Sequence, residues 1–262
     1  MSLIITDPQF IETKNGKLFT IYHEPTGDIA RSSAVLLLYS GDQEYKMLHW
    51  AYRTIANRLT QAGWPVLRFD YSATGDSAGV TGSADINAWT EDAVAAAKYL
   101  LERSGCDELH IVGARLGSFI AARLSNLLPV LNCILWDSPQ SGEHYLEDLQ
   151  QLELAQRKVD RFHKVAIPKR HSSDVAWVYG FPMTKRAVTL IRNLQWQPES
   201  VSSAYAHSLV SAGREQLSCV PGTKYHVAAD IVGWTDHFAV QDALMAPEIV
   251  KAIVNIVGDP AK

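Results

Sequence analysis

Apolar and polar positions along residues 34–137 alternate in blocks, and each block has the period of one kind of secondary structure. Strands that are covered on both faces are typically continuous apolar runs. Residues 34–39 form such a run, and three further segments, at 65–69, 109–112 and 133–136, also read as strands. The stretches between and after them carry apolar residues at helical spacing, at 46–62, 87–103 and 116–127. The alternation predicts βαβ units and a mostly parallel, doubly wound α/β sheet with right-handed crossovers.

The two ends of the chain follow different patterns. Near the N-terminus two alternating runs meet at Asn15-Gly16, which favours an antiparallel hairpin closed by a type I′ turn. Residues 143–198 contain helical stretches at 145–159 and 184–194 and no strong strand, so we expect a helical cap (lid) inserted into the sheet. Weaker strand patterns at 204–210 and 224–228 and a last helix at 247–257 complete the expected core, residues 1–142 and 199–262.

Composition and charge narrow the class of protein. A chain of 262 residues can bury one sizeable core, and a net charge of -4 gives no basic footprint for nucleic acid. No apolar run is long enough for a membrane span, and the first residues lack the pattern of a signal peptide, so a cytoplasmic location is expected. Cys106, Cys133 and Cys219 have no metal-binding spacing and are expected to be reduced. The sequence also has no cofactor motif and no histidine pair with metal spacing, and it does not specify an oligomeric state.

A five-residue motif follows the strand predicted at 109–112. Residues 113–117 read Gly-Ala-Arg-Leu-Gly, which is the frame of a nucleophile elbow, G-x-S-x-G, with Arg115 in the place of the serine. The glycines suit a sharp turn between a strand and a helix, because that turn crowds the backbone. Arg115 cannot replace the serine, since a guanidinium stays protonated and has no usable lone pair for attack or base catalysis.

The residues at the ends of the predicted strands are the other candidates for a site. In open parallel sheets, ligands bind beyond the carboxyl ends of the strands. Ser40, Gly41 and Asp42 follow the first predicted strand, and Ser138 follows the strand at 133–136. With Leu116 at the elbow, these residues form the expected substrate-binding set.

Several stretches make the chain similar to a known superfamily. The run VLRFDYSATGDSAG, followed by GARLGS, resembles the α/β-hydrolase superfamily and its serine aminopeptidase-like branch. Within that branch the chain looks like the hydrolases associated with the bacterial exosortase system, one subfamily of which also has Arg-Leu-Gly at the elbow. The segments GDQEY and WDSPQSGEHYLEDL extend the resemblance over residues 34–150. The chain departs from the superfamily after Asp70, where the usual Arg-Gly-x-Gly-x-Ser is Ser72 to Ser77, and at the usual His-Gly pair, which is Tyr39-Ser40-Gly41.

The resemblance implies a set of roles for this site. In such enzymes a serine attacks an acyl carbon, a histidine takes its proton, an acid orients the histidine and two backbone amides stabilise the oxyanion. His237 has the position of the histidine, with His207 and His226 as weaker alternatives, and Asp137 is one position for the acid. The oxyanion donors would be the amide of Leu116 and one from residues 40–42, and both survive a change of side chain.

Arg115 itself needs a partner, because a cation at a helix N-terminus opposes the helix dipole. Asp137 or Asp70 could supply the charge, and so could an anionic ligand held between Arg115 and the helix amides. Three alternatives follow: a salt bridge that plugs an inactive pocket, an anchor for a carboxylate or phosphate, or an arginine that swings out to solvent.

No other residue is a clear nucleophile or acid. Ser118 lies one turn into the helix and is expected to face neighbouring packing, while Cys106 and Cys133 are expected in the core. Ser40 and Ser138 are expected as loop residues. Glu215 is the nearest carboxylate after the strand at 204–210, so it is the alternative to Asp137 as the acid.

Two functions fit these residues. The first is an enzyme without covalent catalysis, in which Arg115 holds the anionic group of an acyl or carboxylate substrate and His237 is the general base. Hydrolysis by activated water, lyase chemistry or cyclisation would each be compatible with that arrangement. The second is an inactive pseudo-hydrolase that serves as a ligand-binding or accessory protein.

Overall fold

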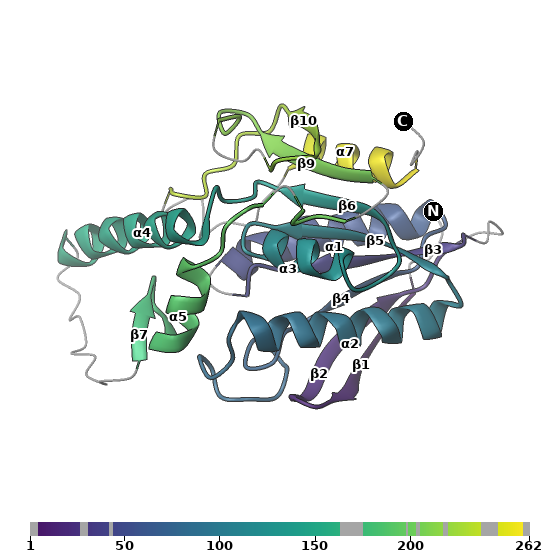
Figure 1. The fold of residues 1–262 in the computed structure, drawn as a ribbon, viewed down its shortest axis with the longest axis horizontal. Helices are drawn as coiled ribbons and strands as arrows, with labels where there is room; N and C mark the ends of the chain where they lie inside the picture. Colours follow the sequence, from purple (N-terminus) through teal and green to yellow (C-terminus); the bar gives the residue numbers. More distant parts are fainter. Residues whose placement is uncertain are drawn as a thin grey trace.

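The protein is a layered α/β structure built on one large sheet (Figure 1). The computed structural model describes residues 5–26, 31–41, 44–162, 175–197, 199–202, 205–216, 220–236 and 246–258. Its eight-stranded sheet has the order β1-β2-β4-β3-β5-β6-β9-β10, and every pair from β4 to β10 is parallel. The strands are β1 (Thr6–Thr13), β2 (Gly16–His23), β3 (Ser33–Leu38), β4 (Val66–Phe69), β5 (Glu108–Ala114), β6 (Val130–Trp136), β9 (Tyr205–Ser211) and β10 (Lys224–Ala228). The mostly parallel sheet expected from the apolar pattern is confirmed.

The N-terminal hairpin is confirmed, but its turn is of a different type from the expected one. β1 and β2 pair antiparallel, with Thr13 opposite Gly16, so the two loop residues are Lys14 and Asn15. A type I′ turn needs a positive φ at both loop residues. Positive φ occurs instead at Gly16, at 108°, and at neither loop residue. The glycine therefore serves the first position of the returning strand.

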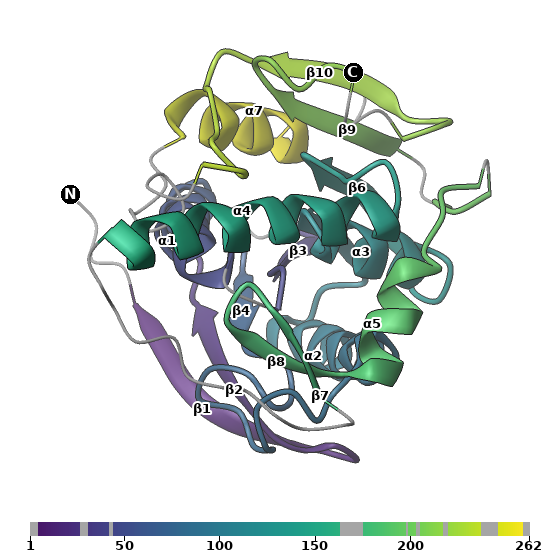
Figure 2. The same ribbon diagram turned by 90° about the vertical axis from the view of Figure 1, so that its left-hand side faces the viewer.

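Two helices cover each face of the sheet. α1 (Glu44–Gln61) and α7 (Pro247–Gly258) contact each other, and α2 (Ile86–Ser104) contacts α3 (Gly117–Ser125). Figure 2 shows the two pairs on opposite sides of the sheet. Burial follows the predicted periodicity: in α1 the side chains of Leu48, Tyr52 and Ile55 are inaccessible to solvent. The sheet is thereby covered on both faces, in agreement with the burial of β3 and β4 along their whole length.

Between β6 and β9 the chain forms further elements that contribute side chains to the common hydrophobic core. They are the helix α4 (Gly142–Phe162), the strands β7 (Val175–Val178) and β8 (Phe181–Thr184), and the helix α5 (Lys185–Arg192). The expectation that this segment has no strong strand is wrong, because β7 and β8 pair as a small antiparallel sheet. Each strand has only four residues, too few for a periodic signal in the sequence. In Figure 2, α4 crosses the near edge of the large sheet, with α5 to one side.

Candidate functional site

The elbow lies between β5 and α3, where the chain turns sharply. Arg115 has a φ of 53°, in the left-handed region that a side chain with a Cβ seldom adopts. A Cβ on Gly117 would lie 2.5 Å from the carbonyl oxygen of Leu38 and 2.6 Å from that of Tyr39. A Cβ on Gly113 would collide with the carbonyl oxygen of Gly117. Both glycines are therefore needed for the close approach of backbone segments, as the motif predicts.

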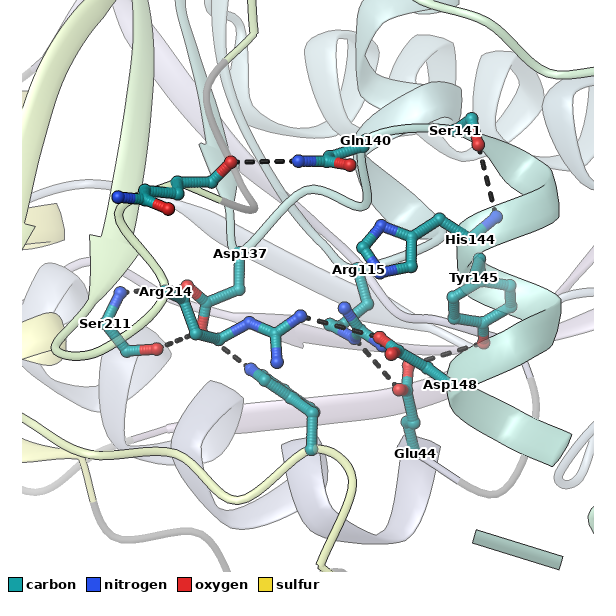
Figure 3. Close-up of polar contacts among 12 residues, drawn as sticks. Glu44, Arg115, Asp137, Gln140, Ser141, His144, Tyr145, Asp148, Ser211 and Arg214 are labelled. Atoms are coloured by element: carbon teal, nitrogen blue, oxygen red, sulfur yellow. Dashed lines mark hydrogen bonds and ion pairs between the residues drawn. The ribbon is translucent and has the colours of Figure 1, made fainter. Parts of the chain in front are cut away.

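The side chain of Arg115 is completely buried at this turn. Its Nε donates to Oε1 of Glu44 at 2.9 Å, and its Nη2 donates to Oδ2 of Asp148 at 2.6 Å (Figure 3). The rings of Tyr145 and Trp234 lie 5.4 and 5.3 Å from the guanidinium carbon. Burial alone would lower the pKa of Arg115, but the two carboxylates outweigh it and raise that pKa. An arginine that swings out to solvent is excluded.

The acids that the sequence suggested for Arg115 have other partners. Asp137, in a left-handed conformation with a φ of 44°, accepts hydrogen bonds from the amide and hydroxyl of Ser211 at 2.8 and 2.5 Å and from Nε1 of Trp234 at 2.7 Å. Asp70 accepts from the hydroxyl of Tyr45 and the amide of Asp76. The expected pairing of Arg115 with Asp137 or Asp70 is therefore wrong. Helices α1 and α4, rather than the neighbouring strand ends, supply its carboxylates.

Glu44 is itself held by side chains from two other segments. The hydroxyl of Ser40 donates to Oε2 of Glu44 at 2.7 Å, and the hydroxyl of Tyr145 lies 3.3 Å from the same oxygen. The hydroxyl oxygens of Ser40 and Tyr145 are also 2.9 Å apart, within hydrogen-bond distance. Ser40, predicted as a substrate-binding residue, thus contributes its hydroxyl to the support of the Arg115 ion pair.

The remaining substrate-binding candidates differ in their burial and in their hydrogen-bond partners. Gly41 has a φ of 76° and packs against the ring of Trp89. Leu116 and Ser138 are inaccessible to solvent, and the Ser138 hydroxyl has no hydrogen-bond partner in the described part of the chain. The backbone amide of Leu116 likewise has no acceptor among the described residues. Asp42 and His237 lie outside the described residues.

Four residues of the site were missed at the level of sequence. They are Glu44, His144, Asp148 and Arg214. Nη2 of Arg214 lies 3.5 Å from Oδ2 of Asp148, and burial, together with the charge of Arg115, lowers the pKa of Arg214. Nδ1 of His144 is buried without a hydrogen-bond partner in the described ranges. Three of these residues fall in the GDQEY and WDSPQSGEHYLEDL segments, where the resemblance was the only available signal.

The weaker candidates lie away from the elbow or are engaged structurally. The Ser118 hydroxyl donates to the carbonyl oxygen of Gly113 at 3.0 Å, as its expected packing role implies. His207 and His226 hydrogen-bond to each other within β9 and β10. Glu215 is exposed, and its carboxylate accepts from the amide of Gly213. Cys106 and Cys133 are buried free thiols, as expected; Cys219 lies outside the described residues.

The side chain at the elbow carries hydrogen-bond donors and no nucleophilic group. No serine, threonine or cysteine stands at the elbow, and Arg115 offers donors only. Within the described residues no group of three or more histidine, cysteine, aspartate or glutamate side chains could hold a metal ion. None of the described helices is long and apolar enough to cross a membrane.

Comparison with known proteins identifies solved structures that are similar to this chain. No protein-family model matches the chain, and no curated protein matches it in sequence. Several solved structures match it in fold. The ferulic acid complex of Est1E from Butyrivibrio proteoclasticus is 12% identical with a TM-score of 0.64, covering 96% of this chain and 98% of that one. The proline iminopeptidase of Mycobacterium smegmatis is 12% identical with a TM-score of 0.59, covering 97% and 98%. A serine hydrolase from Xanthomonas campestris, described as without a lid, is 14% identical with a TM-score of 0.55, covering 97% and 93%.

These likenesses extend over nearly the whole chain at low sequence identity, so they speak to the fold. The mostly parallel eight-stranded sheet with helices on both faces agrees with them. The chain has the α/β-hydrolase fold.

Proposed function

We propose that this protein binds a small ligand with an acyl or carboxylate group at the carboxyl edge of its sheet, and that it forms no acyl-enzyme there. The observation that carries the proposal is the buried arginine at the elbow. Its Nη1 has no hydrogen-bond acceptor among the described residues. Buried donors are seldom left unpaired, and a guanidinium is well matched to the oxygens of a carboxylate. Arg115 is then the anchor for the ligand.

A second candidate function is catalysis without a covalent intermediate. The buried Nδ1 of His144 favours it, because this nitrogen has no hydrogen-bond partner among the described residues and an imidazole can act as a general base. His237 is the general base that the superfamily resemblance suggests, and Asp137 its acid. The amide of Leu116, which has no acceptor among the described residues, would stabilise an oxyanion or enolate. Hydrolysis by activated water, lyase chemistry or cyclisation would then be the reaction.

The plugged, inactive pocket is the third interpretation, and the two ion pairs of Arg115 support it. In that case the protein would act as an accessory protein. A ligand that depends on Arg115 separates this interpretation from the first two, and turnover of that ligand separates the first two from each other.

Several further assignments belong to the proposal. We assign residues 143–198 to a cap over a core of residues 1–142 and 199–262; the position of α4 across the sheet edge supports this division. A cytoplasmic location is supported by the free thiols of Cys106 and Cys133. A relation to the exosortase-associated hydrolases of bacteria rests on Arg115-Leu116-Gly117.

The test is a thermal-shift screen with small carboxylates and acyl thioesters. We expect a ligand that raises the Tm of the wild type and of Arg123→Ala, a control in the last turn of α3, but not that of Arg115→Ala. Arg115→Lys keeps the charge without the planar fork, so it should bind more weakly if the alanine variant does not fold. A screen without any Arg115-dependent ligand would overturn the proposal. Labelling by a serine-reactive fluorophosphonate would also overturn it, because it would reveal a nucleophile.

A further inference from the structure

Two arginine side chains from different strand ends meet at one oxygen of Asp148. Arg115 follows β5 and Arg214 follows β9, and their Nη2 atoms lie 2.6 and 3.5 Å from Oδ2 of Asp148. Asp148 comes from α4, the helix that crosses the edge of the sheet. Figure 3 shows both guanidinium groups directed toward this carboxylate.

Asp148 does not saturate this arginine pair. Nη1 of Arg115 and Nε of Arg214 are buried without a hydrogen-bond partner in the described part of the chain. A guanidinium presents its N–H groups as a fork that matches both oxygens of a carboxylate. Asp148, tethered to its helix, contacts both arginines through a single oxygen. A carboxylate that is free to orient could use two oxygens here.

Asp148 is the replaceable acid of the cluster. The Glu44 side chain is completely buried and is also held by Ser40 and Tyr145. The side chains of Asp148 and Arg214 are 9% and 10% exposed, so solvent reaches this side of the cluster. The hydrogen bonds of Asp148 in the described structure come from the two arginines.

The charges of the cluster indicate that a ligand carboxylate would replace the Asp148 carboxylate and would not bind in addition to it. Three buried carboxylates, those of Glu44, Asp137 and Asp148, lie close enough to act electrostatically on the two arginines, although Asp137 is hydrogen-bonded to Ser211 and Trp234. An added anion would increase an excess of negative charge in a buried site, where charge is poorly screened. A ligand carboxylate that takes the place of Asp148 leaves the balance unchanged, because the Asp148 side chain then turns toward solvent.

We propose that Arg115 and Arg214 form a carboxylate-binding site that Asp148 occupies from within the chain, and that a ligand carboxylate binds by displacing Asp148. This inference rests on the proposed function, because it gives the elbow ligand a carboxylate and adds Arg214 as its second anchor. It also assigns Asp148 a competitive role, so that its removal exposes the site.

The test is chemical rescue of Asp148→Ala by acetate, measured by thermal unfolding. The variant should have a lower Tm than the wild type, and sodium acetate should restore part of the loss in a saturable manner. Sodium chloride at the same ionic strength and the neutral ester methyl acetate should not. Glu147→Ala, at an exposed position of the same helix, is the matched control and should show no specific response to acetate. Asp148→Ser, which also leaves space for acetate, serves the same test if the alanine variant does not fold.

Removal of Arg214 then identifies the site of rescue. In Asp148→Ala combined with Arg214→Gln, the acetate effect should be lost. The inference is overturned if acetate stabilises Asp148→Ala no more than chloride does, or if rescue persists without Arg214. Rescue of Asp148→Ala with no ligand for the wild type would support this site and contradict the proposed function. An Arg115-dependent ligand of the wild type, without acetate rescue of Asp148→Ala, would support the proposed function and overturn this inference.

Discussion

Nε of Arg115 at the elbow donates a 2.9 Å hydrogen bond to Oε1 of Glu44, the first residue of α1, and neither side chain is accessible to solvent. The two residues are 71 positions apart in the chain. The ion pair ties the turn after β5 to the start of the helix after β3. It places a fixed positive charge where the motif has a nucleophile.

Removing the charge of Glu44 should be strongly destabilising. Glu44→Gln leaves Arg115 buried with one fewer counter-charge, and breaking a buried pair in this way typically costs about 3–5 kcal/mol. Urea unfolding should show this loss in the free energy of unfolding. Glu143→Gln, which breaks the exposed pair with Arg192, should cost less than about 1 kcal/mol. Similar losses in the two variants would contradict the structural role assigned to Glu44.

The elbow should not tolerate a methyl group on its second glycine. Gly117→Ala puts a Cβ against two backbone oxygens at 2.5 and 2.6 Å, and backbone atoms cannot move aside easily. Overpacking of this kind costs typically about 1–3 kcal/mol. Gly258→Ala is the control, since its Cβ would meet Trp64 at an ordinary 3.6 Å. Equal Tm values for Gly117→Ala and the wild type would show that the turn is looser than described.

Two buried serines near Asp137 should respond differently to truncation. Ser211→Ala removes a hydrogen bond to a buried carboxylate and should cost about 1.5–3 kcal/mol. Ser138→Ala removes a hydroxyl that has no partner in the described residues, so it should be neutral or slightly stabilising. Chemical denaturation of the two variants tests the contrast. A large loss for Ser138→Ala would reveal a partner for its hydroxyl.

A row of hydrogen-bonded side chains crosses five strands of the sheet, away from the elbow. Its members are Ser33, His110, Asn132, His207 and His226. The amide nitrogen of Asn132 donates to Nδ1 of His110, and its amide oxygen accepts from Nε2 of His207. Because Nδ1 of His110 accepts a hydrogen bond, that imidazole is set as the neutral tautomer with its proton on Nε2. A proton added to Nδ1 of His110 would face the amide nitrogen of Asn132, so two donors would meet.

The row makes stability depend on pH. Burial lowers the pKa of His110 to about 4 and that of His207 also to about 4, in the latter case with the charges of His226 and Lys224 adding to the effect. The unfolded chain takes up these protons near pH 6.5. Stability from the neutral imidazoles is therefore complete above pH 6.5 and is lost as the pH falls toward 4, by up to about 1.4 kcal/mol per pH unit for each histidine. Urea unfolding from pH 7.5 to 4.5 should show this decline.

The variant His110→Asn checks the source of that pH dependence. It removes one of the two histidines. The slope of the free energy of unfolding against pH should therefore decrease by the contribution of about one proton. An unchanged slope would mean that other groups, such as carboxylates, account for the acid sensitivity.

Local sequence patterns were sufficient to predict the fold and to show that the side chain at the elbow cannot act as a nucleophile. The apolar runs and the helical spacing of residues such as Leu48 and Tyr52 predict the parallel sheet, because each strand and helix is buried on the faces that its own period defines. Gly113 and Gly117 predict the tight turn. Arg115 excludes a serine-type nucleophile from its chemistry alone.

The sequence by itself thus determined the layered α/β architecture, the place of the elbow and the identity of the residue that stands there. Only the tertiary structure decided that Arg115 pairs with Glu44 and Asp148, 71 and 33 positions away, while Asp137 binds Ser211 and Trp234. The reason is physical. Periodicity reports which face of an element is buried, whereas the partner of a buried charge depends on where a left-handed turn directs its side chain and on which helices meet there.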